Sequence, residues 1–191
     1  MFALILCGGK STRMGTDKGL MKLNQNQNWA QSMYHKCKSV GLDTLISINL
    51  SQVDTYAQYF NIEDYVIDNF QDIGPFNALL SFYEKHPSAD VLVVSCDMID
   101  LSVEFLKNLV AEYQQTNMYD VIIPERQEGF YQPFPGIYTS EFLQKLYALH
   151  LTQQISKYSF QSILQLFSTY EFKIETSQLS QLKSYNSKDD L

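Results

Sequence analysis

A segment rich in glycine and basic residues follows the first apolar stretch of the chain. Residues 7–20 read "CGGKSTRMGTDKGL", directly after the apolar run "FALIL". Gly8 and Gly9 allow the backbone to approach a ligand closely and to point its N–H groups at anionic oxygens. Arg13 can hold a phosphate through two parallel hydrogen bonds, and Lys18 supplies a compact positive charge. The segment therefore predicts a site for a small phosphorylated ligand.

Two common glycine-rich phosphate loops do not fit this segment. Gly9-Lys10-Ser11 resembles the end of a P-loop, but that pattern needs another glycine five residues earlier, where Leu4 stands. The dinucleotide fingerprint G-x-G-x-x-G also fails, because the glycines lie at 8, 9 and 15. The spacing excludes a P-loop NTPase and disfavours a Rossmann dehydrogenase.

The charge of the chain argues against nucleic acid as a partner. The net charge is −7, although residues 10–22 alone carry +3. A cationic segment on an acidic protein suits a small polyanion bound at one place. No apolar run approaches the ~20 residues that a membrane span needs, and the first residues lack the basic flank of a signal peptide. With three cysteines at unrelated spacings, we expect a cytoplasmic protein without a membrane partner.

Apolar strands alternate with helix-length amphipathic stretches along the chain. Strands are expected at 2–7, 44–49, 65–68, 90–96, 119–124 and, as a late edge strand, 169–175. Helices are expected at 29–40, 52–60, 75–86, 102–116, 139–149 and 159–167. This order predicts an α/β fold with a mostly parallel sheet covered on both faces, in a single domain over residues 1–191. The Asn/Gln-rich stretch 24–28 indicates a turn.

The residues that follow the strands carry the candidate chemistry. Gly8 and Gly9 follow the first strand, Asn49 ends the second, Asp68 ends the third and Asp97 follows the fourth. Ligands of open α/β sheets bind beyond the carboxyl ends of the strands, so these residues should converge on one edge. Asp97 is a candidate ligand for Mg²⁺, which commonly uses one or two carboxylates together with substrate phosphates.

Cysteines and histidines have simpler interpretations. Cys7 and Cys96 should end adjacent buried strands, where a free cysteine usually acts as a small hydrophobe. His35, His86 and His150 lack partners at metal-binding spacing and should be surface or helix-capping groups. The aromatic stretch "GFYQPFPGIY" at 129–138 is compatible either with a core strand and turn or with part of a binding pocket.

The glycine-rich segment also resembles a known family signature. "LCGGKSTRMGTDKGLMKL" matches the pattern L-x-G-G-x-S-x-R-M-G-x-D-K of the molybdenum cofactor guanylyltransferases at every specified position from Leu6 to Lys18. "VIDNFQDIGPFNALLSF", "VSCDMIDL" and the terminal "NSKDDL" resemble later family segments. Ile99 and Asn77 depart from the pattern, which has a proline and a small residue there. The resemblance implies a Rossmann-like three-layer fold of the nucleotide-diphospho-sugar transferase type.

The resemblance further implies an activity. It indicates a nucleotidyltransferase that uses Mg²⁺ to join GMP from GTP to molybdopterin, forming the molybdopterin guanine dinucleotide cofactor and releasing diphosphate. GTP and molybdopterin would be its substrates, and proteins that deliver or receive the molybdenum cofactor would be its partners. Two alternatives stay open: a related cytidylyl- or sugar-nucleotidyltransferase, and a nucleotide-binding module without catalysis.

The resemblance assigns residues to two groups. The nucleotide-binding group comprises Leu6, Cys7, Gly8, Gly9, Lys18, Asn49, Asp68 and Asp97. The catalytic group comprises Arg13, Lys18 and Asp97. Arg13 would neutralise the departing diphosphate, Lys18 would contact the nucleotide phosphates, and Asp97 would bind Mg²⁺ as well as nucleotide. Asp72 stays open as an alternative to Asp68.

Overall fold

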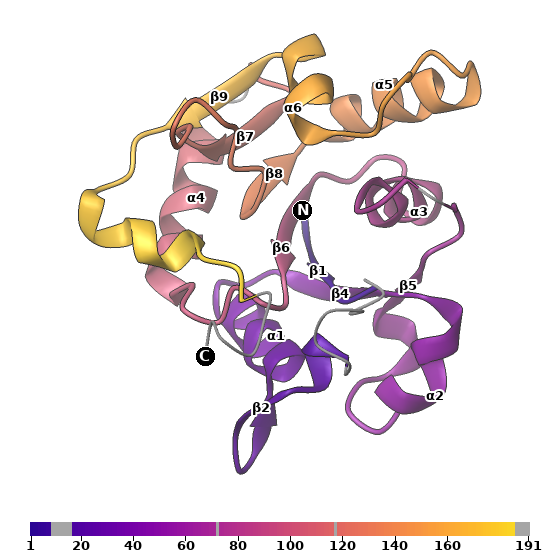
Figure 1. The fold of residues 1–191 in the computed structure, drawn as a ribbon, viewed down its shortest axis with the longest axis vertical. Coiled ribbons are helices and arrows are strands. Elements are labelled where there is room, and N and C mark those ends of the chain that lie inside the picture. The colour runs from indigo at the N-terminus through magenta and orange to yellow at the C-terminus, as the bar shows by residue number, and fades with distance from the viewer. Residues whose placement is uncertain (9–16, 72, 117, 186–191) are drawn as a thin grey trace.

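A computed structural model describes residues 1–8, 17–71, 73–116 and 118–185 of the chain. Its centre is a seven-stranded sheet with the strand order β5-β4-β1-β6-β8-β7-β9 (Figure 1). The strands of this sheet are β1 (Phe2–Leu6), β4 (Asp43–Ile48), β5 (Tyr65–Ile67), β6 (Val91–Ser95), β7 (Val121–Pro124), β8 (Gly136–Tyr138) and β9 (Thr169–Phe172). The expected strands are thus confirmed, with β9 at a sheet edge as predicted.

Helices connect these strands. The α-helices are α1 (Trp29–Ser39), α2 (Val53–Tyr56), α3 (Phe76–Lys85), α4 (Val103–Gln115), α5 (Ser140–Leu151) and α6 (Phe160–Ile163). Short 3-10 helices are η1 (Lys18–Leu20), η2 (Leu50–Gln52), η3 (Ile62–Asp64), η4 (Leu164–Leu166) and η5 (Thr176–Leu182). Within the described residues, no helix has both the length and the apolar composition that a membrane span requires.

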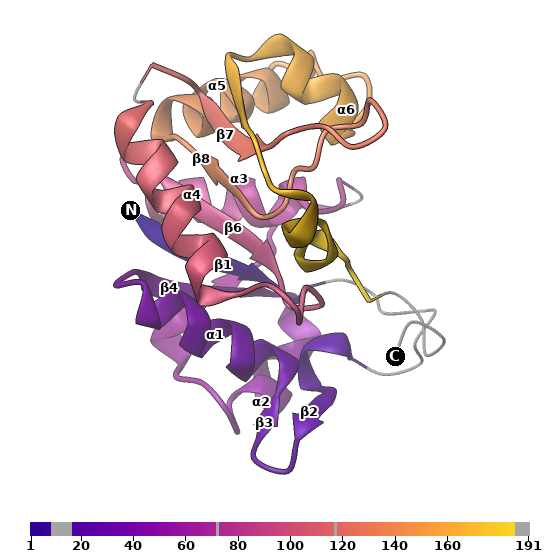
Figure 2. The ribbon, with the colours of Figure 1, turned by 90° about the vertical axis from the view of Figure 1, so that its left-hand side faces the viewer.

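The sheet separates two apolar cores. Ala3 and Ile5 of β1 pack into one core with residues of α1 and α4, whereas Leu4 packs into the other core with residues of α3 and α5. Side chains alternate between the faces of a strand, so an uninterrupted apolar run such as "FALIL" serves both cores. Figure 2 shows α1 and α4 side by side on one face of the sheet. The predicted three-layer arrangement is confirmed.

The strand order reverses at β1. From β1 the chain builds outward through β4 to β5, and then returns to add β6 on the other side of β1. β1, β4, β5 and β6 are parallel, whereas β8 runs antiparallel to both of its neighbours. The carboxyl ends of β1 and β6 therefore form a topological switch point, the place where open α/β sheets bind ligands.

Three expected elements differ from the prediction. The stretch 24–28 forms most of a small hairpin, β2 (Lys22–Asn24) with β3 (Gln27–Asn28), instead of a turn alone. The helix expected at 52–60 ends at Tyr56 and is followed by a turn, in which the Tyr56 carbonyl accepts from the N–H groups of Tyr59 and Phe60. The helix expected at 159–167 divides into α6 and η4.

Candidate functional site

The last residues of three neighbouring strands are tied together at the switch point. The Cys7 N–H donates to the Ser47 carbonyl at 2.9 Å, and the Cys96 N–H donates to the Leu6 carbonyl at 3.2 Å. A hydrogen bond with Cys7 and burial raise the pKa of the Cys96 thiol, so this thiol stays protonated. The interpretation of both cysteines as small buried groups at strand ends is confirmed, since both side chains are buried.

Lys18 and Asp97 meet at this edge of the sheet. The Lys18 Nζ lies 2.8 Å from Asp97 Oδ2, and the two side chains are 18% and 9% exposed. Asp97 Oδ1 accepts from the Ser95 hydroxyl at 2.6 Å. The structure therefore joins two predicted site residues that are 79 positions apart. Ser95 was not predicted, although its place as the last residue of β6 marks the same edge.

Asp68 faces Gly8 across the end of β4. The Ser47 hydroxyl donates to Asp68 Oδ1 at 2.7 Å, and Asp68 Oδ2 lies so near Gly8 that a β-carbon there would overlap it. The Asn49 side-chain amide donates to the Gly8 carbonyl at 3.4 Å. Burial raises the pKa of Asp68, against the lowering effect of the Ser47 hydrogen bond. Gly8, Asn49 and Asp68 are thus brought together as the sequence predicted.

Asn77, which departs from the family pattern, holds the loop that follows Asp68. Asn77 Oδ1 accepts from the Phe70 N–H at 2.9 Å, and the Asn77 amide donates back to the Phe70 carbonyl. The neighbouring Ser81 hydroxyl accepts from the Asn69 N–H at 3.0 Å. Asn77 therefore anchors the loop to α3, which explains why a larger polar residue fits there.

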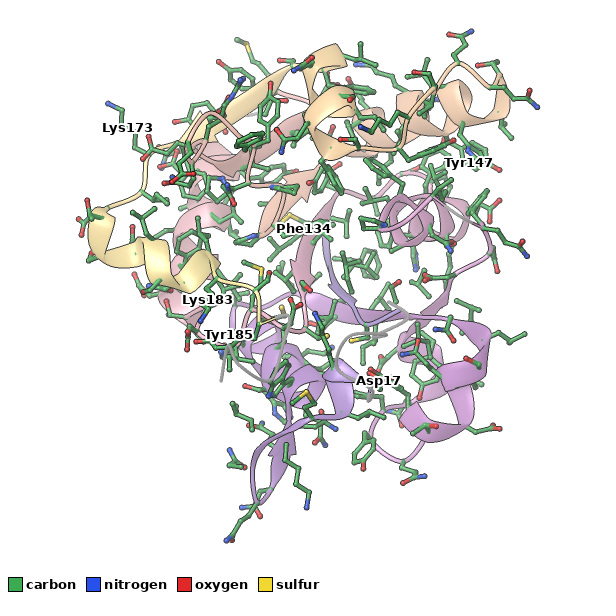
Figure 3. The ribbon with its side chains drawn as sticks, viewed as in Figure 1. Asp17, Phe134, Tyr147, Lys173, Lys183 and Tyr185 are labelled. Carbon is green, nitrogen blue, oxygen red and sulfur yellow. The ribbon has the colours of Figure 1, made fainter. Side chains whose placement is uncertain are left out.

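Asp17 is the centre of a network that the sequence did not predict. Its Oδ1 accepts from the Gly19 N–H at 3.0 Å and from the Tyr56 hydroxyl at 2.9 Å, and its Oδ2 accepts from the Gln52 side chain at 2.5 Å. Figure 3 labels Asp17, which lies toward α2. The spacing Asn49-x-x-Gln52, typical of a helix cap, was the available signal for Gln52.

The C-terminal part of the chain braces Asp97 from the other side. The Tyr185 N–H donates to the Asp97 carbonyl at 3.1 Å, and the Tyr185 hydroxyl donates to Asp100 at 2.5 Å. The Tyr185 ring lies edge-on to Trp29 of α1, with centroids 6.4 Å apart, and Figure 3 shows Tyr185 where the chain passes α1. The Ile99 carbonyl accepts from Lys36 at 2.7 Å, so a lysine holds this turn where the family has a proline.

The aromatic stretch 129–138 contains both buried and exposed rings. Tyr138 of β8 is fully buried and its hydroxyl donates to the Pro133 carbonyl at 2.7 Å. The Tyr131 ring is buried under the Arg126 guanidinium, 3.9 Å from its centroid. Phe130 is 61% exposed. The core strand and turn are therefore present.

No group of three or more His, Cys, Asp or Glu side chains in the described ranges is arranged to hold a metal ion. His35 hydrogen-bonds to Gln27, His86 caps the end of α3, and His150 contacts Tyr158 near the end of α5. Asp97 offers a nearly buried carboxylate beside Lys18, and carboxylate oxygens are ligands that Mg²⁺ uses. Substrate oxygens and water would supply the other ligands of such an ion.

Several predicted residues fall outside the described part of the chain. These are Gly9, Arg13 and Asp72. Leu6 and Cys7 lie at and just after the end of β1, and their carbonyls accept from Cys96 and Gln52 respectively.

The chain was compared with a family model and with the sequences of known proteins. Residues 3–166 match the family model described as the MobA-like NTP transferase domain. A bifunctional molybdenum cofactor biosynthesis protein of Synechocystis is 27% identical over 75% of this chain and 40% of its own, so the chain spans less than half of that protein. A probable molybdenum cofactor guanylyltransferase of Flavobacterium johnsoniae is 26% identical over 98% of this chain and 92% of its own.

A solved structure confirms the fold. Molybdopterin-guanine dinucleotide biosynthesis protein A of Archaeoglobus fulgidus superposes with a TM-score of 0.78 at 16% identity, covering 100% of this chain and 94% of its own. The Rossmann-like fold of the nucleotide-diphospho-sugar transferase type is thereby confirmed. Because the family model spans most of the chain, the chain belongs to the MobA-like NTP transferase domain family and is a nucleotidyltransferase.

Proposed function

We propose that the chain transfers GMP from GTP to molybdopterin, forming the molybdopterin guanine dinucleotide cofactor and releasing diphosphate. The observation that carries the proposal is the Lys18–Asp97 pair, 2.8 Å apart at the edge of the sheet on which Gly8 and Asp68 also lie. A cation and a carboxylate in one nearly buried place suit a nucleotide triphosphate with its metal ion. The names of the relatives support the choice of pterin acceptor.

The chemistry needs no side-chain nucleophile. A terminal phosphate oxygen of the pterin would attack the α-phosphorus of GTP and form a new P–O bond, while the bond to the bridging oxygen breaks and diphosphate leaves. Such transfers depend on positioning and on neutralising charge more than on covalent chemistry of the protein. Lys18 would bind the phosphates, and Arg13 would stabilise the leaving diphosphate.

Asp97 is the residue that would hold a magnesium ion. When bound, Mg²⁺ would neutralise phosphate charge as the transition state forms. Asp97 is kept in place by the Ser95 hydroxyl at 2.6 Å and by the backbone bond from Tyr185 at 3.1 Å. Both contacts leave the carboxylate at the edge of the sheet, beside Lys18.

The arrangement around Gly8 supports a preference for guanine. Asp68 presents an acceptor oxygen beside Gly8, and guanine carries two adjacent donors, N1–H and N2–H. Adenine has an acceptor at N1, so it would leave buried groups unpaired at about 1–3 kcal/mol each. Cytosine is smaller and would not reach the same groups. A site that recognises its ligand by hydrogen bonds discriminates well against analogues that cannot form them.

A nucleotide panel tests this function. We expect diphosphate release with molybdopterin and Mg²⁺ to show a kcat/KM for GTP at least ten-fold above those for ATP and CTP, since 1.4 kcal/mol corresponds to a factor of about ten. Comparable values for GTP and CTP would contradict the guanine preference and favour a cytidylyltransferase. The absence of release with every triphosphate would favour a binding module without catalysis.

A further inference from the structure

We propose that Gln52 is a positioning residue, which ties Cys7 to Asp17 and thereby holds Lys18 in reach of Asp97. Cys7 and Asp17 stand at either end of the glycine-rich stretch that the sequence singled out. The structural part of this inference stands on the described contacts alone. Its catalytic part rests on the proposed function of Lys18.

Gln52 uses its whole amide group in this arrangement. Its Nε2 donates to the Cys7 carbonyl at 3.0 Å and to Asp17 Oδ2 at 2.5 Å. Its Oε1 accepts from the Asn49 N–H at 2.9 Å. A primary amide has two N–H donors and one carbonyl oxygen, so every polar group of this side chain has a partner. Because one side chain bonds both chain segments, it fixes the distance between them.

Asp17 passes this constraint on to Lys18. Its other oxygen accepts from the buried Tyr56 hydroxyl at 2.9 Å and from the Gly19 N–H at 3.0 Å. Asp17 is thus the N-cap of η1, whose first residue is Lys18. A β-carbon on Gly19 would overlap the Tyr56 hydroxyl, so η1 packs directly against α2. The backbone of Lys18 therefore starts from a point that α2 and η2 hold in place.

The position of Lys18 matters because its ammonium group must reach both Asp97 and a ligand. The side chain of lysine is long and flexible, so its useful orientation depends on where its backbone is anchored. A misplacement of about 1 Å in a catalytic group can reduce a rate about 100-fold. Gln52 lies outside the predicted set of ligand-binding residues, and its effect would reach the ligand through Lys18.

The substitution Gln52→Glu tests the contact with little change in shape. The carboxylate it introduces would still accept from the Asn49 N–H, since Glu and Gln both serve in such caps. At high pH it would face the Asp17 carboxylate and repel it, whereas at low pH one shared proton would restore a donor. Tyr56 of α2 and Cys96 after β6 are the titratable groups that act with Asp17, Cys7 after β1 acts on both of them, and Lys18 follows Asp17 in the chain.

Gln31→Glu is the matched control. Gln31 occupies the same position in the Asn28 cap of α1, where its Oε1 accepts from the Asn28 N–H at 3.1 Å. We expect the Q52E kcat/KM for GTP to be at least ten-fold below wild type at pH 8, and this deficit to shrink as the pH is lowered to 6. Q31E should follow wild type throughout. A Q52E profile that parallels that of Q31E would overturn the proposal.

A double-mutant cycle tests whether the effect passes through Lys18. We expect Q52E to reduce kcat/KM at pH 8 by less than three-fold when Lys18 is already alanine, because the residue it positions is gone. Full additivity of the two reductions would show that Gln52 does not act through Lys18. If Q52E does not fold, Tyr56→Phe serves in its place, with an expected three- to ten-fold loss of kcat/KM that is likewise absent beside Lys18→Ala; an unchanged kcat/KM in Y56F contradicts the proposal.

Thermal unfolding separates this inference from the proposed function. The melting temperature of Q52E should fall relative to Q31E as the pH rises from 6 to 8, whether or not the chain transfers GMP. If that difference appears while wild type releases no diphosphate, the contact is supported and the proposed function fails. If it is absent in a wild-type enzyme that is active with GTP, the positioning role fails alone.

Discussion

Asp97 combines contacts from three parts of the chain. Its carboxylate accepts hydrogen bonds from the Lys18 ammonium group at 2.8 Å and from the Ser95 hydroxyl at 2.6 Å. Its carbonyl accepts from the Tyr185 N–H at 3.1 Å. The neighbouring Asp100 is exposed and accepts from the Tyr185 hydroxyl instead. Two carboxylates in one turn therefore have different surroundings, and the nearly buried one carries the proposed metal role.

Asp97→Asn should reduce turnover by about 100-fold or more, the range seen when a single electrostatic group is removed from an active site. A neutral amide is a poor ligand for Mg²⁺ and a weaker partner for Lys18. Diphosphate release over a magnesium titration provides the measurement, with Asp100→Asn as the control that should stay near wild type. Ordinary rates for D97N at millimolar magnesium would remove Asp97 from the metal role.

Asp68 should make folding stability depend on pH. Burial raises its pKa, so the folded protein holds this proton more readily than the unfolded chain does. The ionised carboxylate therefore costs stability above the raised pKa, and the cost disappears below the unfolded value of about 3.9. We expect Asp68→Asn to melt at a higher temperature than wild type at pH 7 and at the same temperature near pH 3, while binding GTP more weakly.

Asp43→Asn is the control for this pH effect. Asp43 begins β4, and its side chain is 83% exposed, so its replacement removes no buried carboxylate. Its melting curve should follow wild type at both pH values. A D68N protein that is less stable than wild type at pH 7 would show that the Asp68 carboxylate stabilises the fold.

Two glycines should separate stability from activity at the level of the elements. On Gly136 of β8 a β-carbon would lie 2.6 Å from the Pro133 carbonyl oxygen and 2.8 Å from Ile123 of β7. On Gly8 it would overlap the Asp68 carboxylate, which is the end of a side chain and can move. Backbone atoms and packed strands move less readily than the end of a side chain does, so the clash at Gly136 should cost more stability.

Gly136→Ala should therefore lower the free energy of unfolding by roughly 1–3 kcal/mol, with kcat/KM for GTP nearly unchanged in the folded fraction. Gly8→Ala should show the opposite pattern, with a small change in stability and a larger loss of GTP efficiency. Urea titrations and steady-state kinetics on both variants measure the two effects. Equal losses of stability in the two proteins would refute this assignment.

At the scale of the whole molecule, one sheet carries two cores on its opposite faces. Residues 176–185, which include η5, run from the β9 side to the α1 side of the molecule (Figure 2). There the Gln181 side chain accepts from the Ser102 N–H at 3.0 Å, and Tyr185 packs against Trp29. These contacts join the C-terminal segment to α1 and to the start of α4, which cover the same face of the sheet.

We expect urea unfolding to be one cooperative transition, as is usual for small single domains. Trp29 is the single tryptophan of the chain and is buried at the start of α1, so its fluorescence reports on that side of the sheet. Far-UV circular dichroism reports on all helices together. Coincident midpoints would support a single domain over residues 1–191, and separated midpoints would contradict it.

The sequence alone predicted the layers of the fold and the edge where the site lies. Uninterrupted apolar runs separated by amphipathic stretches determine a parallel sheet covered on both faces, and ligands of such sheets bind where the strands end. Gly8, Asn49, Asp68 and Asp97 could therefore be selected by their position after a strand. Periodicity along the chain contains this information because local backbone geometry decides which residues of an element share a buried face.

Only the tertiary structure decided which side chains touch. The Lys18–Asp97 pair, the Asp68 carboxylate beside Gly8 and the Gln52 bond to Asp17 join residues between 35 and 79 positions apart. Such contacts depend on strand order and on the angle at which helices return, and neither leaves a periodic signal in the sequence. The short strand β8 was ambiguous for the same reason, since three residues in an aromatic stretch pair as a strand because β6 and β7 lie on either side.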